Sequence, residues 1–443
     1  MIDRSELEAI AARLVDDAKK MVPEAEVSVR VGTSRAANVR FGANEVESCG
    51  DANDERVVVE VALGKRHASV TSNQTDETAT HALVARAVAM ARVAPEDPEY
   101  VPILAPQSYV AVPDAFDRGI VEMTSEARAL VAQVAIAAAR QAGLKGAGYL
   151  GTSADDTVLA NSVGLRAAHR ETFGSFSMTA RTKDATGSGW ALRASHEARA
   201  IDAAAVGRAA ADKALRSTGA RPLDPGKYTV VLEAPAVADL LGFLRGPLSA
   251  RAVDEGRSAL TKPGGGSRLG EAIGSPIVTL RSDPADPEIP VAPFDDDGSP
   301  RKAVTWLDRG VLSALHYSRY WGAKHGKEPT PFGNVHLSGG DAGSVDELVR
   351  GVKRGLLVTH FFYIRVLDPH EASVTGLTRD GLFLIEDGKV TTPVQNFRFN
   401  QSVLALLKNC DAMTRETWRV TGGLRVPAMR STEFNMASVS EAV

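Results

Sequence analysis

The sequence predicts an α+β protein. We expect an N-terminal α/β domain with helices on a curved sheet (residues 1–221) and a C-terminal, mainly-β, barrel-like domain (residues 222–443). Helical and strand-like patterns alternate through the first half, whereas short β-type runs separated by Gly, Asp and Pro dominate the second half. At residues 221–226, two prolines and a glycine interrupt both periodicities, so we place the domain boundary there.

The first half is expected to open with an amphipathic helix. Ser5 and Glu8 form a capping box, apolar residues then recur at helical spacing, and Pro23 ends the pattern. Helical patterns predict three further helices, at 76–93, from 124 or 125 to 141, and at 202–217. Strand-like runs lie at 26–31, 37–41, 56–63, 67–71, 157–159, 169–180 and 190–194.

The second half begins with a buried-type strand at 228–232 and a short apolar helix at 236–245. Further β-type runs follow at 277–280, 311–317, 356–367, 382–386 and 389–391. Many short strands separated by turn residues favour a barrel-like or curved-sheet core.

Composition limits the classes of function. The 443 residues are 44% hydrophobic and 24% charged, which is enough to bury a substantial core. The net charge is −4 and no Lys or Arg run is long enough to follow a phosphate backbone, so we expect no direct nucleic-acid ligand. The N-terminus lacks a basic region followed by an apolar run, and no stretch has the length of a membrane span, which predicts a cytoplasmic protein without membrane contact. Cys49 and Cys410 are too few for a disulfide framework and are expected to be reduced, mostly packed thiols.

Several polar clusters have a possible catalytic or metal-binding role. In each case we favour an ordinary structural or solvent-exposed role instead. The acidic turn 295–298 lacks the later ligands of a calcium loop, and the glycine-rich loop 262–266 lacks a Walker pattern, so we expect a solvated turn and a mobile loop. His196-Glu197 and His370-Glu371 are not followed by a second histidine at ligand spacing and are expected to be surface pairs. The remaining histidines of the second half follow no known ligand spacing: His316, His325, His336 and His360.

An ordered set of segments in the second half resembles the TldD/PmbA metallopeptidase family. No single segment is specific, but their order is, and together they cover most of residues 226–443. The first half resembles the family more loosely, through its helix–strand pattern and residues 161–164. The segments of the second half are 228–232, 240–241, 251–258, 293–300, 355–359, 367–369, 375–381, 384–389 and 425–429.

The resemblance implies a zinc site in the catalytic members that this chain does not reproduce. Such members supply two imidazoles and a carboxylate from a His-Glu-x-x-x-His helix, and a further ligand from a distant cysteine. Aligned by the preceding strand, the corresponding positions here are Gly242, Phe243 and Pro247, none of which binds a metal or acts as a base. No cysteine stands near 418–420, where the distant ligand is expected. The resemblance is therefore to the E-type (TldE/PmbA-like) subunit, and we expect no catalytic residue and no metal or cofactor in this chain.

One strand of the second half is a candidate substrate surface. The run 356–367 alternates polar and apolar residues, which suits a half-buried strand that presents polar side chains to a groove. An ordinary outward polar face explains the pattern equally well. In the family, peptides are thought to add to an inner sheet as an extra strand. The candidate substrate-binding residues are Thr359, His360, Tyr363 and Arg365.

The resemblance thus predicts a pseudoenzyme that acts within a peptidase complex. The expected partner is a TldD-type subunit that carries the zinc and forms a heterodimer enclosing a chamber for unfolded peptides or peptide precursors. Two alternatives remain: a stand-alone homodimer that binds peptides or another ligand, and an enzyme of natural-product chemistry with a different site.

Overall fold

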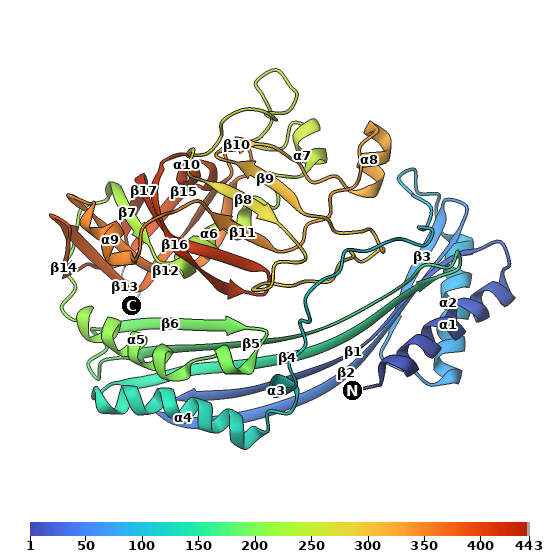
Figure 1. Cartoon of the computed structure of the whole chain (residues 1–443), viewed down its shortest axis with the longest axis horizontal. Coiled ribbons are helices and arrows are strands. Elements are labelled where there is room, and N and C mark those ends of the chain that lie inside the picture. Colours follow the sequence, from blue (N-terminus) through green and yellow to red (C-terminus); the bar gives the residue numbers. More distant parts are fainter. Residues whose placement is uncertain (441–443) are drawn as a thin grey trace.

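The computed structural model describes residues 1–440 and arranges them around two β-sheets (Figure 1). The first half forms a six-stranded antiparallel sheet in the order β3-β2-β1-β4-β5-β6, and the second half forms an 11-stranded sheet. The six-stranded sheet is a long curved layer, with the C-terminal part resting above one side of it. The predicted fold class, α+β with helices on a curved N-terminal sheet and a mainly-β second part, is confirmed.

The strands of the six-stranded sheet are longer than the sequence patterns predict. The predicted strands at 26–31 and 37–41 are one continuous strand, because residues 32–36 remain paired with both neighbours although their small and polar side chains break the alternation. The strands are β1 (Glu26–Gly42), β2 (Glu45–Leu63), β3 (Arg66–Ser72), β4 (Lys145–Asn161), β5 (Arg166–Arg181) and β6 (Ser188–Ser195).

The four helices predicted in the first half are confirmed: α1 (Arg4–Met21), α2 (Glu77–Val93), α4 (Ser125–Gln141) and α5 (Ala203–Arg216). A short helix, α3 (Arg118–Val121), was not predicted. The capping box at Ser5 is wrong, because Asp3 is the N-cap of α1 and accepts a hydrogen bond from the Ser5 amide at 3.1 Å.

Both helix pairs cover the same face of the six-stranded sheet. Odd-numbered residues of β1 pack against α1 and α2 at one end, through Val27, Val29 and Val31, and against α4 and α5 at the other, through Val39 and Phe41. Because side chains alternate along a strand, the even-numbered residues of β1 lie on the opposite face, toward the C-terminal part. The helix-covered face therefore holds two apolar cores.

The C-terminal part surrounds one large apolar core. Its strands are β7 (Gly226–Leu232), β8 (Thr279–Ser282), β9 (Val304–Asp308), β10 (Val311–Leu312), β11 (Val335–Ser338), β12 (Arg354–Asp368), β13 (Ser373–Glu386), β14 (Lys389–Pro393), β15 (Phe397–Ser402), β16 (Cys410–Thr421) and β17 (Leu424–Val439). Its helices are α6 (Ala234–Leu241), α7 (Ala250–Asp254), α8 (Arg319–His325), α9 (Val345–Arg350) and α10 (Val403–Lys408).

Two predictions for this part need correction. The expected strand 311–317 is limited to β10, since the chain beyond it crosses to an isolated bridge between Ser249 and His316. The long hairpin of β16 and β17 was not predicted, because its register shifts three times and disturbs the period-two pattern. In the described residues, 1–440, no helix combines the length and apolar character needed to cross a bilayer.

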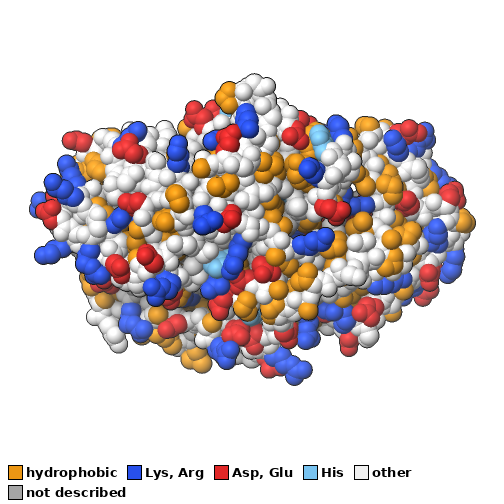
Figure 2. Space-filling model, turned by 45° about the horizontal axis from the view of Figure 1, so that its top comes forward, with side chains coloured by type: hydrophobic (Ala, Val, Ile, Leu, Met, Phe, Trp, Pro, Cys, Tyr) orange, Lys and Arg blue, Asp and Glu red, His pale blue; other side chains and the backbone are white. Residues whose placement is uncertain are grey.

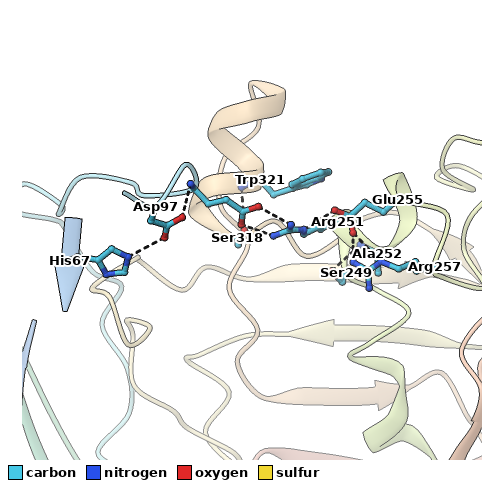
Figure 3. A network of polar contacts seen from close by, with 10 residues as sticks. His67, Asp97, Ser249, Arg251, Ala252, Glu255, Arg257, Ser318 and Trp321 are labelled. Carbon is cyan, nitrogen blue, oxygen red and sulfur yellow. Dashed lines mark hydrogen bonds and ion pairs between the residues drawn. The ribbon is translucent and has the colours of Figure 1, made fainter. Parts of the chain in front are cut away.

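A polar clamp joins the two parts at the connector between α2 and α3 (Figure 3). Arg251 of α7 donates to both carboxylate oxygens of Glu99, at 2.7 and 2.8 Å, and its Nε donates to Glu255 at 2.9 Å. On the connector, Asp97 accepts from the His67 ring at 3.0 Å. A bidentate Arg–carboxylate pair fixes geometry better than a single contact, so the clamp holds the connector in register with the C-terminal part.

Candidate functional site

The helix aligned with the family's zinc motif is α6, followed by the 3₁₀ turn η2 (Gly242–Leu244). Gly242 borders open space: a Cβ built on it would meet no atom within 4 Å. Phe243 packs its ring against the C-terminal core. Pro247 lies beyond the turn, where its carbonyl accepts from the Ser258 hydroxyl at 2.8 Å. The side chains at the three positions are therefore a hydrogen atom, a phenyl ring and a pyrrolidine ring, none of which carries a metal-binding atom.

These residues do not fit a zinc ion, which needs three or four nitrogen, sulfur or carboxylate donors around one point. Within residues 1–440, no group of three or more His, Cys, Asp or Glu side chains is placed to hold a metal. The distant position on β16 carries Trp418, Arg419 and Val420 instead of a thiol. Cys410, at the start of β16, is buried, and burial raises the pKa of its thiol to about 12.

Asp239 is the only ionisable side chain on α6. Its Oδ2 accepts a hydrogen bond from the Phe361 amide of β12 at 2.9 Å. Burial raises the pKa of this carboxyl to about 7, and the Phe361 amide opposes the shift only in part. Asp239 thus anchors α6 to β12. This contact could not be predicted from the sequence, because the residues around Asp239 are apolar.

A cavity of about 330 Å³ lies between β6, the edge strand of the six-stranded sheet, and β16 of the C-terminal part. The first residues of α6, Ala234 and Pro235, form part of its wall. Its polar lining includes Arg193, Lys213, Glu233, Ser344, Thr414, Glu416, Trp418 and Arg419. The cavity therefore joins the start of α6 to the part of β16 at which the family's distant ligand was expected.

A half-buried ion pair crosses this boundary between the two parts. Lys213 of α5 donates to Glu233 at 2.6 Å and to the Trp190 carbonyl at 3.1 Å. A second contact links the Ser188 hydroxyl of β6 to the Asp380 carboxylate of β13. Both contacts tie the edge strand and its helix to the second part, and the Lys213–Glu233 pair lies in the wall of the cavity itself.

The four predicted substrate-binding residues do not share one face. Thr359 is fully buried and its hydroxyl donates to the carbonyls of β13, while the His360 ring is buried against Trp190, with centroids 4.3 Å apart. Tyr363 and Arg365 are exposed, with the Arg365 guanidinium 4.4 Å from the centre of the Tyr363 ring. The alternation is broken because β12 shifts register between Phe362 and Arg365, and Tyr363 takes a positive φ of 56° there.

Comparison with known proteins assigns most of the described residues to one family. Models of the PmbA/TldA metallopeptidase domains match in order: domain 1 at residues 27–91, the central domain at 121–218 and the C-terminal domain at 225–438. The chain belongs to the PmbA/TldD family. A metalloprotease from Methanothermobacter thermautotrophicus is 26% identical over 226 residues, which is 47% of this chain and 47% of that protein. The match thus spans about half of the length of that relative.

Three solved structures match almost the entire chain. TldE from Thermococcus kodakarensis superimposes with a TM-score of 0.87 at 19% identity, covering 97% of this chain and 100% of that one. A candidate modulator of a DNA gyrase from Thermotoga maritima gives 0.86 at 19% identity, over 97% and 99% of the two chains. A candidate modulator of DNA gyrase from Bacteroides thetaiotaomicron gives 0.85 at 21% identity, over 99% and 100%. At these identities the likeness establishes the fold.

The other predicted clusters of this PmbA/TldD-family chain have structural partners. The turn 295–298 is solvated as predicted, since Asp296 and Asp297 are exposed, and its three aspartates also form ion pairs with Arg301, Arg30 and Arg319. His196 is half-buried and its Nδ1 accepts from Arg419 at 3.1 Å, which corrects the prediction of a surface pair. Cys49 is exposed, contrary to the expected packing, whereas Cys410 is buried as predicted.

Charged side chains of both signs alternate with apolar ones over the face shown in Figure 2, without an extended basic area on that face. That distribution agrees with the net charge of −4. Binding to a nucleic-acid backbone needs clustered Lys and Arg side chains, so this face does not favour it.

Proposed function

We propose that this chain is the non-catalytic subunit of a TldD/TldE-type zinc metallopeptidase complex, which degrades unfolded peptides or processes peptide precursors. The observation that carries the proposal is the donor set at the start of η2, where Gly242 and Phe243 stand in place of a metal ligand and a base. A single substituted ligand could be replaced by a neighbour. The loss of both imidazoles, the carboxylate and the thiolate leaves nothing from which to rebuild a site.

In this proposal the chain acts by holding substrate and partner. The zinc belongs to a TldD-type partner, and any hydrolysis takes place there. The residues of this chain supply a rigid wall of the cavity between β6 and β16. Asp239 anchors α6, and the Lys213–Glu233 pair connects the two parts of the chain. An extended peptide, which has no fold to lose, is the ligand that suits a cavity between a sheet edge and a hairpin.

Mixing experiments test this proposal. The purified chain should be inert toward unstructured peptides and should bind a TldD-type subunit from the same genome, and only the mixture should cleave. Replacing the glutamate of the partner's zinc motif should abolish cleavage, whereas Phe243→Ala in this chain should change it only modestly. Chelator-sensitive hydrolysis by this chain alone would overturn the proposal and favour an enzyme with a different site, including one of natural-product chemistry.

A stand-alone, homodimeric binding protein is the second candidate function. The observation in its favour is the cavity between β6 and β16, which does not require a partner for its walls. Native mass spectrometry distinguishes the two. A stable homodimer that does not bind the TldD-type subunit and still binds its ligand would favour this second function.

A further inference from the structure

Arg193 of β6 borders the cavity between β6 and β16 without an acidic partner. Its guanidinium carbon lies 4.2 Å from the centre of the Trp418 ring, and its Nη1 donates to the neighbouring Leu192 carbonyl at 3.1 Å. Within residues 1–440, no carboxylate lies within 4 Å of this guanidinium. Burial lowers the pKa of its guanidinium, and an arginine keeps its charge in proteins near neutral pH.

Three cations elsewhere along the same boundary are paired with carboxylates. Lys213 pairs with Glu233 at 2.6 Å, Arg251 with Glu99 at 2.7 Å, and Arg301 with Asp295 at 3.0 Å. Taking a guanidinium partly out of water without a counter-ion costs free energy, which an anion in the cavity would recover. Arg193 therefore differs from these neighbours in having its charge directed at a cavity instead of at a carboxylate.

The start of α6 adds a second feature that favours an anion. Ala234 and Pro235 line the cavity, and Glu233, the N-cap residue, does not accept a hydrogen bond from the helix with its side chain. By contrast, the N-caps of α1, α2, α4 and α5 all accept one. The positive end of the helix dipole thus borders the cavity without a side-chain cap, although Pro235 contributes no N–H donor.

The other charges around the cavity do not cancel this preference. Glu233 is neutralised by Lys213, and Arg419 adds a further positive charge to the lining. Asp202 and Glu416 also attract Arg193, but both are exposed and lie beyond ion-pair distance of its guanidinium, so they compete only weakly through solvent. The lining contains three positive and two negative side chains, an excess of one positive charge. The positive ones are Arg193, Lys213 and Arg419, and the negative ones are Glu233 and Glu416.

We propose that this cavity binds a carboxylate-bearing ligand, with Arg193 as the anchor and Trp418 as the surface that holds the guanidinium in place. The planar fork of an arginine matches the two oxygens of a carboxylate, and stacking on an indole limits its rotation. The volume of about 330 Å³ suits the end of a peptide chain. If the chain serves a peptidase complex, as proposed above, this ligand is the free C-terminus of an extended peptide.

The test uses the isolated full-length chain and needs no partner. Isothermal titration calorimetry compares N-acetyl-tetraalanine as the free acid, the same peptide as its C-terminal amide, and inorganic phosphate. We expect the acid to bind at least about tenfold more tightly than the amide, which corresponds to the loss of a charge-assisted contact. We also expect the fluorescence of Trp418 to change on binding of the acid, and this change to disappear in Trp418→Phe.

Variants show whether Arg193 is responsible. Arg193→Gln should reduce the affinity for the acid to that for the amide, and Arg193→Lys, which keeps the charge without the fork, should retain part of the difference. Arg208→Gln is the matched control, because Arg208 is an exposed arginine of α5 outside the cavity lining. Unchanged melting temperatures establish that the variants are folded.

Three results would overturn the proposal: equal affinities for acid and amide, undiminished binding by folded Arg193→Gln, or phosphate binding as tight as that of the acid. The last result would indicate a general anion site. The outcome is independent of the proposed complex, since acid-selective binding by the isolated chain can coexist with a mixture that fails to hydrolyse peptides, and the reverse also holds.

Discussion

The two faces of the six-stranded sheet differ in chemistry although the same strands form both. The face toward the helices carries valine, alanine and phenylalanine, as in the stacked rings of Phe41 and Phe176. The opposite face of β4 and β5 carries polar and charged side chains, among them Asp155, His169 and Glu171, which border a cavity of about 260 Å³ against the C-terminal part. One face therefore supplies stability, and the other is available for binding and for contact between the two parts.

Truncating the apolar face should have the largest effect. Phe176 is fully buried, so Phe176→Ala removes a ring from the core and should lower the free energy of unfolding by about 3–5 kcal/mol. Glu171→Gln, five residues earlier on β5 and on the opposite face, should change it by less than about 1 kcal/mol. Urea denaturation of both variants measures the difference. Equal losses would contradict the division between the two faces.

The next effect concerns Asp239, the buried carboxyl that links α6 to β12. Burial raises its pKa to about 7, so its contribution to stability is fully present below pH 3.8, the ordinary value, and is lost as the pH rises through about 7. Asp239→Asn keeps an oxygen that accepts from Phe361 and removes the charge. At pH 8 the variant should exceed the natural chain in stability by at most about 4 kcal/mol, and at pH 4 the two should be nearly equal.

Melting temperatures across pH 4 to 8 test this expectation. Asp224→Asn provides a control, because Asp224 lies at an exposed position of the segment between the two sheets. A stability difference for Asp239→Asn that does not vary with pH would show that the carboxyl remains ionised in the folded chain.

Breaking one ion pair between the two parts should have a smaller effect. Lys213→Met leaves Glu233 half-buried without its partner and should cost about 1–3 kcal/mol. Adding Glu233→Gln should recover part of that loss, because both charges are then gone. A double-mutant cycle by chemical denaturation gives the coupling free energy. If the changes in the free energy of unfolding caused by the two substitutions simply add, this pair does not hold the two parts together.

The smallest effect is expected at the surface bulge of β12. Tyr363 has a φ of 56°, a region that glycine occupies without steric cost, and its side chain is 66% exposed. Tyr363→Gly should therefore raise the free energy of unfolding by up to about 1 kcal/mol, whereas Tyr363→Ala should change it less. Destabilisation by the glycine variant alone would indicate that the ring makes a contact that outweighs the strain.

Local patterns predicted the helices well because each begins and ends with its own signals. Thr124, one of the two residues expected to cap its helix, is the N-cap of α4. The helices predicted at 76–93 and 202–217 are present over Glu77–Val93 and Ala203–Arg216. The strands were predicted only in part, since their middle sections are held by pairing with distant strands. Residues 32–36, for example, are extended because both β2 and β4 bond to them. The division into domains at residues 221/222 stays a prediction.

For the candidate site, the sequence by itself determined which side chains are absent from α6, because Gly242 and Phe243 lack metal-binding atoms in any conformation. Only the tertiary structure decided which residues meet. Arg193 and Trp418 are more than two hundred positions apart, and they come together because β6 is the edge strand that faces β16. The separation of Thr359 and His360 from Tyr363 and Arg365 has the same origin, since a bulge set by pairing with β13 turns the second pair outward. Residue identity is a local property, whereas burial and proximity follow from long-range pairing, which no local pattern contains.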